Sequence, residues 1–356
     1  MMQQFIAKIG KGQKASKDLT WDEAKQAMRA LIEGRATPAQ VGAFLLAMRV
    51  KMESVSELAA FTSAVREYVP PLRVASSLPL VDVSSYAGKH ETFHALAGAA
   101  IIAAAAGAAV LIHGHEGISE RTSMAAVLAG IGIPTDLEPK RTAEEVSSKG
   151  LAYLDVALYH PPVARFLDLR RELGVRSFFH PVAKMLNPAR ASVQVIGVTH
   201  PPYIGKMAEA LHMLGGRRAL IVRGVEGDPE LSIAAATKLL EVTEQRVLPL
   251  TLQPADIGLP FGSSREMAGF SPARIDQEAA LLKRILQNEV RGGQRDWVIQ
   301  NGAMLMYAAG LTPSISSAVP LAQRTLESGA AANKLIELSS VADVVWSGQG
   351  SKDSGR

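Results

Sequence analysis

Short apolar runs alternate with helical patterns through the middle of the chain, and this alternation constrains the fold most strongly. It predicts strands over residues 80–83, 109–113, 151–158, 193–198 and 219–223, separated by helices over 92–106, 119–130, 163–174 and 203–214. Strands that alternate with helices pair in parallel and carry helices on both faces. The pattern therefore predicts an α/β domain with a mostly parallel central sheet flanked by helices.

The segments on either side of this region have mainly helical patterns. Thr20 and Glu23 form a capping box, Thr37 and Pro38 repeat the device, and a third helix is expected over residues 54–68. After an extra strand over 247–252, helices are expected over 275–288, 296–309 and 318–328. The prediction is a small N-terminal helical domain at 1–76 and a large α/β domain at 77–346. The hinges lie near residues 70–80, residues after 160 can also contribute to the helical domain, and 347–356 form a disordered tail.

The composition excludes several kinds of site. The chain has no cysteine, so disulfides, thiolate metal sites and cysteine nucleophiles are excluded, and a cytoplasmic location is expected. The N-terminus has no signal-peptide pattern. Residues 95–112 lack charge, but they are mostly alanine and glycine, so a buried helix followed by a buried strand is favoured over a membrane span.

Positive charge is concentrated between Pro161 and Arg223. This stretch holds ten basic and three acidic residues, an excess of seven, whereas the whole chain has a net charge of +4. The excess is consistent with a solvated surface or with a surface that binds phosphates. For the second case, the predicted nucleic-acid contacts are Arg165, Arg171, Arg176, Lys184, Arg190, Lys206 and Arg217.

Two loops are expected to meet at one edge of the sheet. Residues 84–90 follow the first strand and residues 113–117 follow the second. Ligands of open α/β sheets bind at the carboxyl ends of the strands, where loops before helices hold anions. These loops are therefore the predicted ligand site.

The order of motifs from about Phe5 to Leu338 resembles the anthranilate phosphoribosyltransferase family. The resemblance implies a small helical domain joined by a hinge to an α/β domain, and a homodimer formed through the helical domains. It rests on Pro38-Ala39-Gln40 and the residues up to Arg49, Ala103 to Gly107, His113-Gly114, Tyr159-His160-Pro161, Arg170 to Arg176, Asn187-Pro188 and Met207-Ala208-Glu209.

Much of what the resemblance implies for catalysis is absent. The family loop Gly-Thr-Gly-Gly-Asp, which wraps the diphosphate of phosphoribosyl diphosphate, aligns with Ser85-Tyr86-Ala87-Gly88-Lys89. The family block Asn-x-Ser-Thr aligns with His94-Ala95-Leu96-Ala97, and the lysine before His-Gly is Ile112. The Asp-Glu pair that holds magnesium in the family aligns with Pro229-Glu230, although an aspartate, Asp228, directly precedes Pro229. Magnesium is therefore expected only if phosphoribosyltransferase activity is retained.

Some positions of the family site remain. Arg170 matches the arginine that faces the anthranilate carboxylate, and Arg121 stands where the family has a lysine. We predict a vestigial site for phosphate or substrate, without catalytic residues that can be named and with no metal assigned. It consists of Gly88, Lys89, His113, Gly114, His115, Ser119, Arg121, Arg170 and Glu230.

The departures resemble a paralogous branch, the YbiB-like proteins, which keep the fold, lack the transferase activity and bind nucleic acid through a basic groove on the dimer. The shared features are Ser85-Tyr86-x-Gly88, Gly174 to Arg176 followed by Ala183-Lys184, Thr199 to Gly205, Gly215-Gly216-Arg217 and Ile9 to Gly12.

Three local interpretations remain open at this point. Lys89 is either a new anion contact or a solvated lysine. His90, His94, His113 and His115 are either metal ligands or remnants of the old phosphate site, and the second is favoured. Tyr86, Tyr159 and Tyr203 are candidates for stacking on bases, whereas Phe178 and Phe179 are expected in the core.

Two functions remain. One is a homodimeric protein that binds DNA or RNA without sequence preference, with a small phosphorylated ligand as a further possibility. The other is a divergent phosphoribosyl- or glycosyltransferase acting on an aromatic or nucleobase acceptor.

Overall fold

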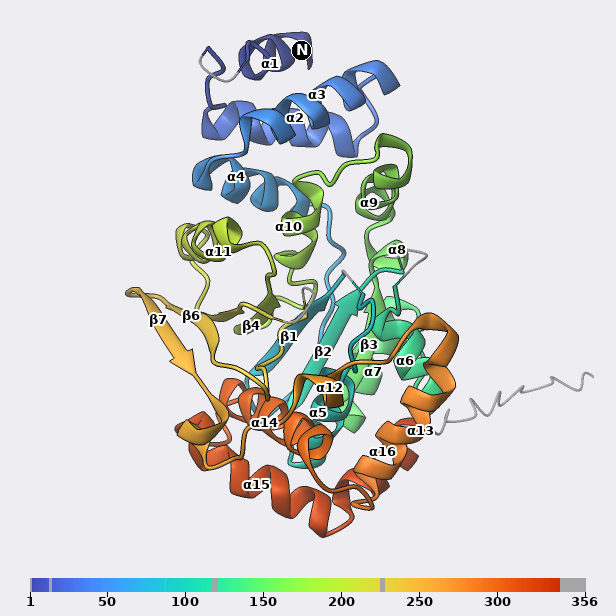
Figure 1. Cartoon of the computed structure of the whole chain (residues 1–356). Helices are drawn as coiled ribbons and strands as arrows, with labels where there is room; N and C mark the ends of the chain where they lie inside the picture. Colours follow the sequence, from blue (N-terminus) through green and yellow to red (C-terminus); the bar gives the residue numbers. More distant parts are fainter. Residues whose placement is uncertain (1, 13–14, 87, 117–120, 225–227, 340–356) are drawn as a thin grey trace, which may run out of the picture.

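The computed structural model describes residues 2–12, 15–86, 88–116, 121–224 and 228–339. A small N-terminal helical domain stands above an α/β domain with a mostly parallel sheet flanked by helices (Figure 1). This architecture confirms the predicted fold class. The predicted tail at 347–356 and Ser119 lie outside the described residues.

The N-terminal helices begin where the sequence places their caps. Thr20, Thr37 and Ser54 each accept a hydrogen bond from the backbone N–H three residues later. The side chain of that later residue accepts a hydrogen bond from the backbone N–H of the cap residue, which completes a capping box. The helices are α1 (Met2–Ile9), α2 (Trp21–Ile32), α3 (Pro38–Lys51) and α4 (Val55–Arg66).

A seven-stranded sheet forms the centre of the α/β domain, in the order β3-β2-β1-β4-β5-β6-β7. The first five strands in this order are parallel, and β6 and β7 extend the sheet as antiparallel strands. The strands are β1 (Leu80–Ser85), β2 (Ala109–Gly114), β3 (Leu151–Asp155), β4 (Val193–Gly197), β5 (Arg218–Val222), β6 (Thr237–Thr243) and β7 (Val247–Leu252).

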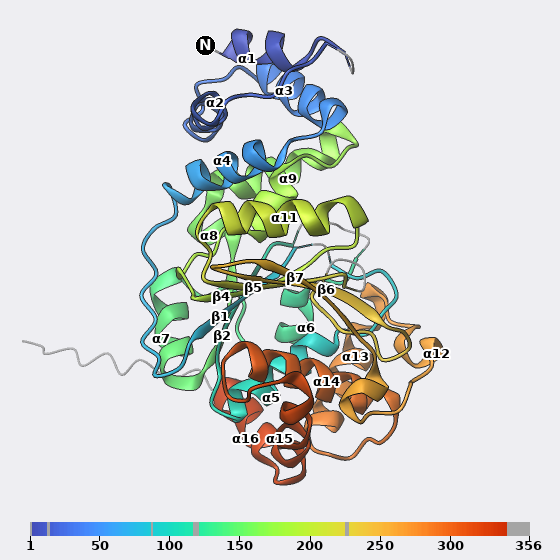
Figure 2. The same ribbon diagram turned by 90° about the vertical axis from the view of Figure 1, so that its left-hand side faces the viewer.

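Helices cover both faces of this sheet, as Figure 2 shows with the sheet between α11 (Pro201–Met213) and α5 (Ala95–Ala105). Successive residues of a strand point to opposite faces of the sheet, so they pack in different hydrophobic cores. Val110 and Ile112 pack with α5, α6 (Met124–Ile131), α13 (Ile275–Leu286), α14 (Gly293–Ala308), α15 (Ile315–Glu327) and α16 (Ala330–Ser339). Leu111 packs on the other face, with α7 (Pro139–Lys149), α8 (Val156–Tyr159), α9 (Pro161–Leu173), α10 (Phe179–Lys184) and α11.

The second core continues into the helical domain through aromatic side chains. The Phe178 ring stacks on Phe61 with centroids 4.6 Å apart and meets Phe44 edge-on at 6.0 Å. Phe179 stacks on Phe166 at 4.2 Å. Phe178 and Phe179 are therefore buried, as expected. Helices from after residue 160 pack against the N-terminal ones, while the exact domain boundaries stay a prediction.

Some expected elements differ from the structure. Residues 156–158, expected to extend a strand, form α8, because Asp155 caps this helix through a hydrogen bond from the Ala157 N–H. The helix expected from residue 119 begins at Met124 after the Ser123 cap. Elements that the sequence did not predict include α1, α7, α8, α10, α16, β6, α12 (Ser264–Met267), η2 (Pro254–Ile257) and η3 (Pro272–Arg274).

Within the described part of the chain, no helix combines the length and apolar character needed to span a bilayer. Residues 95–112 form the buried helix α5 and most of the buried strand β2, as predicted.

Candidate functional site at the carboxyl ends of the strands

The two predicted loops meet beside the point where the strand order reverses. The chain passes from β1 to β2 on one side and later returns to β4 on the other side of β1. Such a reversal leaves a crevice at the carboxyl ends of the strands. Ser85 of the first loop is paired with Gly114 of the second, and Lys89 forms two backbone hydrogen bonds of 2.8 Å each with Thr122, further along the chain from the second loop. The site can therefore be described from these loops outward.

Lys89 is neither a solvated lysine nor an exposed anion contact, so both sequence interpretations are wrong. Its side chain is fully buried, and Nζ donates to Glu230 Oε2 at 2.6 Å and to the Phe93 carbonyl at 2.8 Å. The ammonium also lies 5.0 Å from the centroid of the Trp297 ring. Burial raises the pKa of Glu230, and the Lys89 ammonium opposes this rise. A buried cation is thus matched to a buried carboxylate.

The carboxylates at this position do not fit a magnesium ion. Glu230 Oε1 accepts from the Leu96 N–H at 3.0 Å, and Asp228 Oδ1 accepts from Ser85 Oγ at 2.6 Å. Magnesium requires oxygen ligands at about 2.0–2.1 Å in octahedral order. A lysine ammonium at Glu230 opposes a second cation there, and the described residues contain no cluster of three or more His, Asp or Glu suited to a metal.

Two glycines of the site are required by the backbone. Gly88 has a φ of +62°, and a Cβ there would lie 2.9 Å from the Thr122 carbonyl oxygen. At Gly114 a Cβ would lie 2.2 Å from the Ser85 carbonyl oxygen and 2.7 Å from the Tyr153 hydroxyl. Both glycines therefore have a packing reason that needs no bound phosphate.

His113 belongs to a buried hydrogen-bond network instead of an open ligand site. Its Nδ1 lies 2.7 Å from the Tyr86 hydroxyl and 3.1 Å from the Tyr159 hydroxyl. Its Nε2 lies 3.2 Å from Asp82 Oδ2, which also accepts from Gln194 Nε2 at 3.3 Å. Burial raises the pKa of both tyrosines, which keeps the hydroxyls protonated. The buried Tyr86 and Tyr159 are therefore unavailable for stacking on bases, contrary to expectation.

The other histidines also have protein partners. His94 Nδ1 lies 2.8 Å from Glu278 Oε1 in the core, and Nε2 lies 3.2 Å from the Thr122 carbonyl oxygen. His115 lies between Asp155 and Asp168, at 3.3 and 3.4 Å. Burial would lower the pKa of His115, but the two carboxylates outweigh it and raise the pKa. His94, His113 and His115 therefore each contact different protein groups.

A cavity of about 330 Å³ opens beside this region, at the carboxyl end of β4, and we call it the basic cavity. Arg49 and Arg176 line it. Burial lowers the pKa of Arg176, and the nearby Arg170, Arg121 and Arg49 lower it further. The Arg176 side chain has no hydrogen-bond or carboxylate partner among the described residues, and Arg170 Nη1 is buried without one. The guanidinium groups of Arg170, Arg121 and Arg49 therefore repel that of Arg176.

The surroundings of the basic cavity also lower the pKa of two further groups, which leaves His180 neutral and Lys184 mostly protonated at neutral pH. Burial, aided by nearby cations, lowers the pKa of His180 to about 3. Burial also lowers the pKa of Lys184 to about 8, although Asp228 opposes this shift. Lys184 Nζ donates to the Gly197 carbonyl at 2.5 Å, so its geometry is fixed. The cavity favours the entry of a negative group.

The seven predicted nucleic-acid contacts do not lie along one surface. Arg176 and Lys184 line the basic cavity, and Lys206 lies on α11 near it, donating to the Glu53 carbonyl. Arg165 and Arg171 are exposed on α9, and Arg171 pairs with Asp168 at 2.8 Å. Arg190 and Arg217 line another cavity at the opposite, amino end of β4. Sequence alone therefore grouped residues that the sheet separates.

Sequence reasoning missed Arg49, Asp82 and Arg66. Asp82 carried a signal, because it is a charged residue inside an expected buried strand. Arg49 and Arg66 carried none, because a basic residue near the end of a helix is common on solvated surfaces.

Comparisons with known proteins agree with this architecture. Residues 78–332 match the model of the α/β domain of a glycosyl transferase family, and residues 3–69 match its helical bundle domain. Anthranilate phosphoribosyltransferase of Laribacter hongkongensis is 36% identical over 322 residues, covering 90% of this chain and 93% of that protein. The enzyme of Methylibium petroleiphilum is 35% identical over 320 residues, covering 90% and 92%.

Solved structures give the same result. The crystal structure of anthranilate phosphoribosyltransferase from Thermus thermophilus has a TM-score of 0.82 at 32% identity, covering 95% of this chain and 98% of that one. The enzyme from Saccharomyces cerevisiae, in complex with PRPP and Mg, has a TM-score of 0.80 at 18% identity, covering 95% and 96%, and shares the fold. This chain therefore belongs to the anthranilate phosphoribosyltransferase family.

Proposed function

We propose that this chain is a homodimeric, sequence-nonspecific nucleic-acid-binding member of the family with a degraded phosphoribosyl-diphosphate site. The observation that carries the proposal is the buried ion pair between Lys89 and Glu230. The resemblance aligns Lys89 with a loop aspartate and Glu230 with a magnesium ligand. An ammonium 2.6 Å from the glutamate opposes a divalent cation by charge and by space.

The basic cavity supplies the positive charge that a phosphate backbone needs. Arg49 and Arg176 line the cavity, and Arg121 and Arg170 lie close enough to lower the pKa of Arg176, so positive charge is concentrated in and beside it. The nearest acid on α9, Asp168, already contacts Arg171 and His115. A bound phosphate would relieve this repulsion.

The outer face of α3 supports the homodimer. Leu46 and Val50 are 53% and 52% exposed, and Ala39 and Ala43 continue the same exposed row. These positions are three or four residues apart, so they share one side of the helix. An apolar row of this kind is suited to the same helix of a second copy.

The direct test is a titration of labelled single-stranded and duplex DNA at low and high salt, monitored by fluorescence anisotropy. We expect binding at low salt and a steep loss of affinity as salt rises. Arg176→Gln should weaken binding to all sequences alike and reduce the salt slope by about 1. The matched control is Arg284→Gln, because Arg284 is 60% exposed on α13 across the sheet. Absence of binding at low salt would contradict the proposal.

The second candidate is a divergent phosphoribosyl- or glycosyltransferase. It is favoured by the identity of about a third to anthranilate phosphoribosyltransferases over most of the chain. Its expected cofactor is magnesium, which the ion pair between Lys89 and Glu230 opposes, and its acceptor would be an aromatic or nucleobase compound. Calorimetry with phosphoribosyl diphosphate and magnesium separates the two functions. Heat of binding at millimolar ligand that disappears in Glu230→Gln would favour the transferase, and its absence from the wild type would oppose it.

A further inference from the structure

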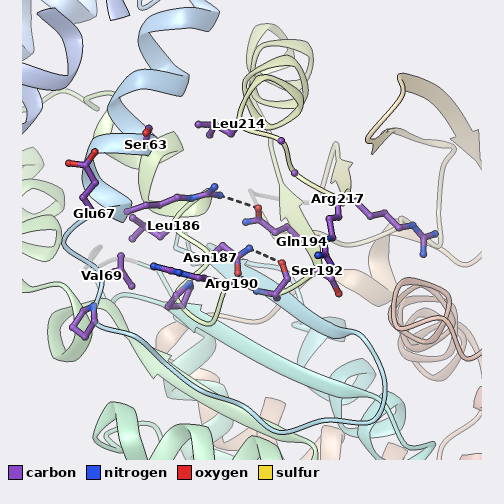
Figure 3. A pocket seen from close by; sticks show the side chains of 17 residues that line it. Ser63, Glu67, Val69, Leu186, Asn187, Arg190, Ser192, Gln194, Leu214 and Arg217 are labelled. Carbon is purple, nitrogen blue, oxygen red and sulfur yellow. Dashed lines mark hydrogen bonds between the residues drawn. The ribbon is translucent and has the colours of Figure 1, made fainter. Parts of the chain in front are cut away.

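A second cavity, of about 560 Å³, lies at the amino ends of β4 and β5, and we call it the amino-edge cavity. Its walls come from the end of α4, the loop between α10 and β4, and the segment between α11 and β5 (Figure 3). β4 separates it from the basic cavity, which lies at the other end of that strand. The volume is within the usual range for small-molecule sites, about 300–1,000 Å³.

The charges of this cavity are unbalanced. Arg190 and Arg217 are exposed in its wall, and neither side chain has a hydrogen-bond or carboxylate partner among the described residues. The acid in the lining is Glu67, which is held by Lys25 at 2.6 Å and Arg29 at 2.8 Å. Arg218 is satisfied by Glu241 at 2.8 Å. The positive charge of Arg190 and Arg217 therefore has no counter-charge among the residues that the structure describes.

A third guanidinium is fixed in the wall. Arg66 donates from Nε and Nη2 to the Met185 carbonyl at 3.0 and 2.5 Å, and from Nη2 to Gln194 Oε1 at 3.2 Å. Its Nη1 group makes no hydrogen bond with the described residues. Gln194 is held in turn by Asp82. Arg66 thus caps the end of α10 and keeps one donor group free.

The loop that carries Arg190 is held in a strained conformation. Asn187 and Arg190 have φ values of +51° and +50°, in a region that residues other than glycine rarely adopt. The Asn187 side chain secures the loop by accepting from the Ala191 N–H at 2.7 Å and donating to the Ala191 carbonyl at 2.9 Å. Such strain concentrates at binding sites, where it fixes a side chain before the ligand arrives.

We propose that the amino-edge cavity binds a small phosphate monoester, with its phosphate held by Arg66, Arg190 and Arg217. Guanidinium groups suit phosphate because each presents paired donors in a plane. The hydroxyls of Ser63 and Ser192 also line the cavity and form no hydrogen bond within the described chain. They provide partners for a hydroxylated carrier, such as a sugar or a nucleoside.

The shape of the site favours a small molecule over a nucleic-acid backbone. The cationic side chains of the amino-edge cavity surround one hollow, and the basic cavity lies at the other end of β4. A backbone contact would need cations spaced along a path. This inference is independent of the proposed function, because neither the basic cavity nor Lys89 takes part in it.

The test is isothermal titration calorimetry of the full chain with glucose 6-phosphate and with AMP. Glucose, adenosine and inorganic sulfate serve as reference compounds. We expect at least one phosphate ester to bind at millimolar concentration or below, and the uncharged parents not to bind. Arg190→Gln and Arg217→Gln should each weaken binding about tenfold, which corresponds to ~1.4 kcal/mol. Arg284→Gln is the matched control, since Arg284 is exposed on α13 outside this cavity.

Three results would overturn the proposal. They are absence of heat with both esters, equal weakening by Arg284→Gln, and sulfate binding as tight as that of the esters. The double variant Arg190→Gln/Arg217→Gln is also titrated with DNA. Unchanged DNA affinity supports a separate small-molecule site, whereas lost affinity would make the cavity part of a nucleic-acid path. If the wild type binds no DNA, the proposed function fails while the calorimetry still decides this inference.

Discussion

Two positions at the ends of the parallel sheet treat positive charge in opposite ways. Near the carboxyl end of β1, Lys89 is fully buried and paired with Glu230, unlike the arginines of the basic cavity. At the amino ends, Arg190 and Arg217 remain exposed around a cavity and have no acid partner in the described chain. A charge removed from water needs a partner to be tolerated, whereas a charge left in water is free to meet a ligand. The first arrangement serves the fold, and the second suits binding.

The largest expected effect comes from breaking the buried pair. Lys89→Met leaves Glu230 buried beside an apolar side chain, so we expect the free energy of unfolding to fall by about 3–5 kcal/mol. Urea denaturation measures this change. The double variant Lys89→Met/Glu230→Gln should recover most of the loss, because both charges are then absent. A single variant as stable as the wild type would remove the contrast between the two ends.

A smaller loss is expected from Arg66, an amino-edge cation that is held by hydrogen bonds to the end of α10 and to Gln194. Arg66→Met leaves the Met185 carbonyl and Gln194 Oε1 without this donor, and should lower the free energy of unfolding by about 1–3 kcal/mol. Thermal and urea unfolding of Arg66→Met should give the same loss of free energy of unfolding relative to the wild type. A change as large as that of Lys89→Met would show that the amino end also depends on a buried charge.

Relief of strain should act in the opposite direction. Arg190→Gly places glycine at a φ of +50°, and we expect an increase in the free energy of unfolding of up to about 1 kcal/mol. Arg190→Ala keeps the unfavourable backbone and is the control for loss of the side chain. Equal stability of the two variants would argue against strain at this loop.

The smallest effect concerns pH at the rim of the carboxyl end. His115 has a pKa above its ordinary value of 6.5, so its ion pairs with Asp155 and Asp168 stabilise the folded state fully below that pH. This contribution is lost as the pH rises through the folded-state pKa. Comparison of wild type and His115→Gln by urea unfolding from pH 5 to 9 should show a difference that shrinks with rising pH. A difference that grows with pH would contradict the assignment.

The fold was more predictable from the sequence than the site. Capping residues such as Thr20 and Thr37 act within one turn of their helix. Short apolar runs separated by helical patterns indicate the strands in the same way, so both kinds of element can be predicted from neighbouring residues. Lys89 was misjudged because its partner Glu230 lies 141 residues further along the chain. Likewise, Arg190 and Arg176 are close in sequence but lie at opposite ends of β4. Both the burial of Lys89 and the separation of the two arginines depend on contacts between residues far apart in the sequence, and a local sequence pattern does not show such contacts.

The aromatic cluster of the helical domain has a consequence for synthesis of the chain. Phe44 and Phe61 leave the ribosome early, yet the third ring of their cluster belongs to Phe178, which is made only after β1, β2 and β3. Chains are made at about 5–20 residues per second, so these apolar side chains wait several seconds for their partner. The helices that are made first are therefore among the last to acquire a complete core.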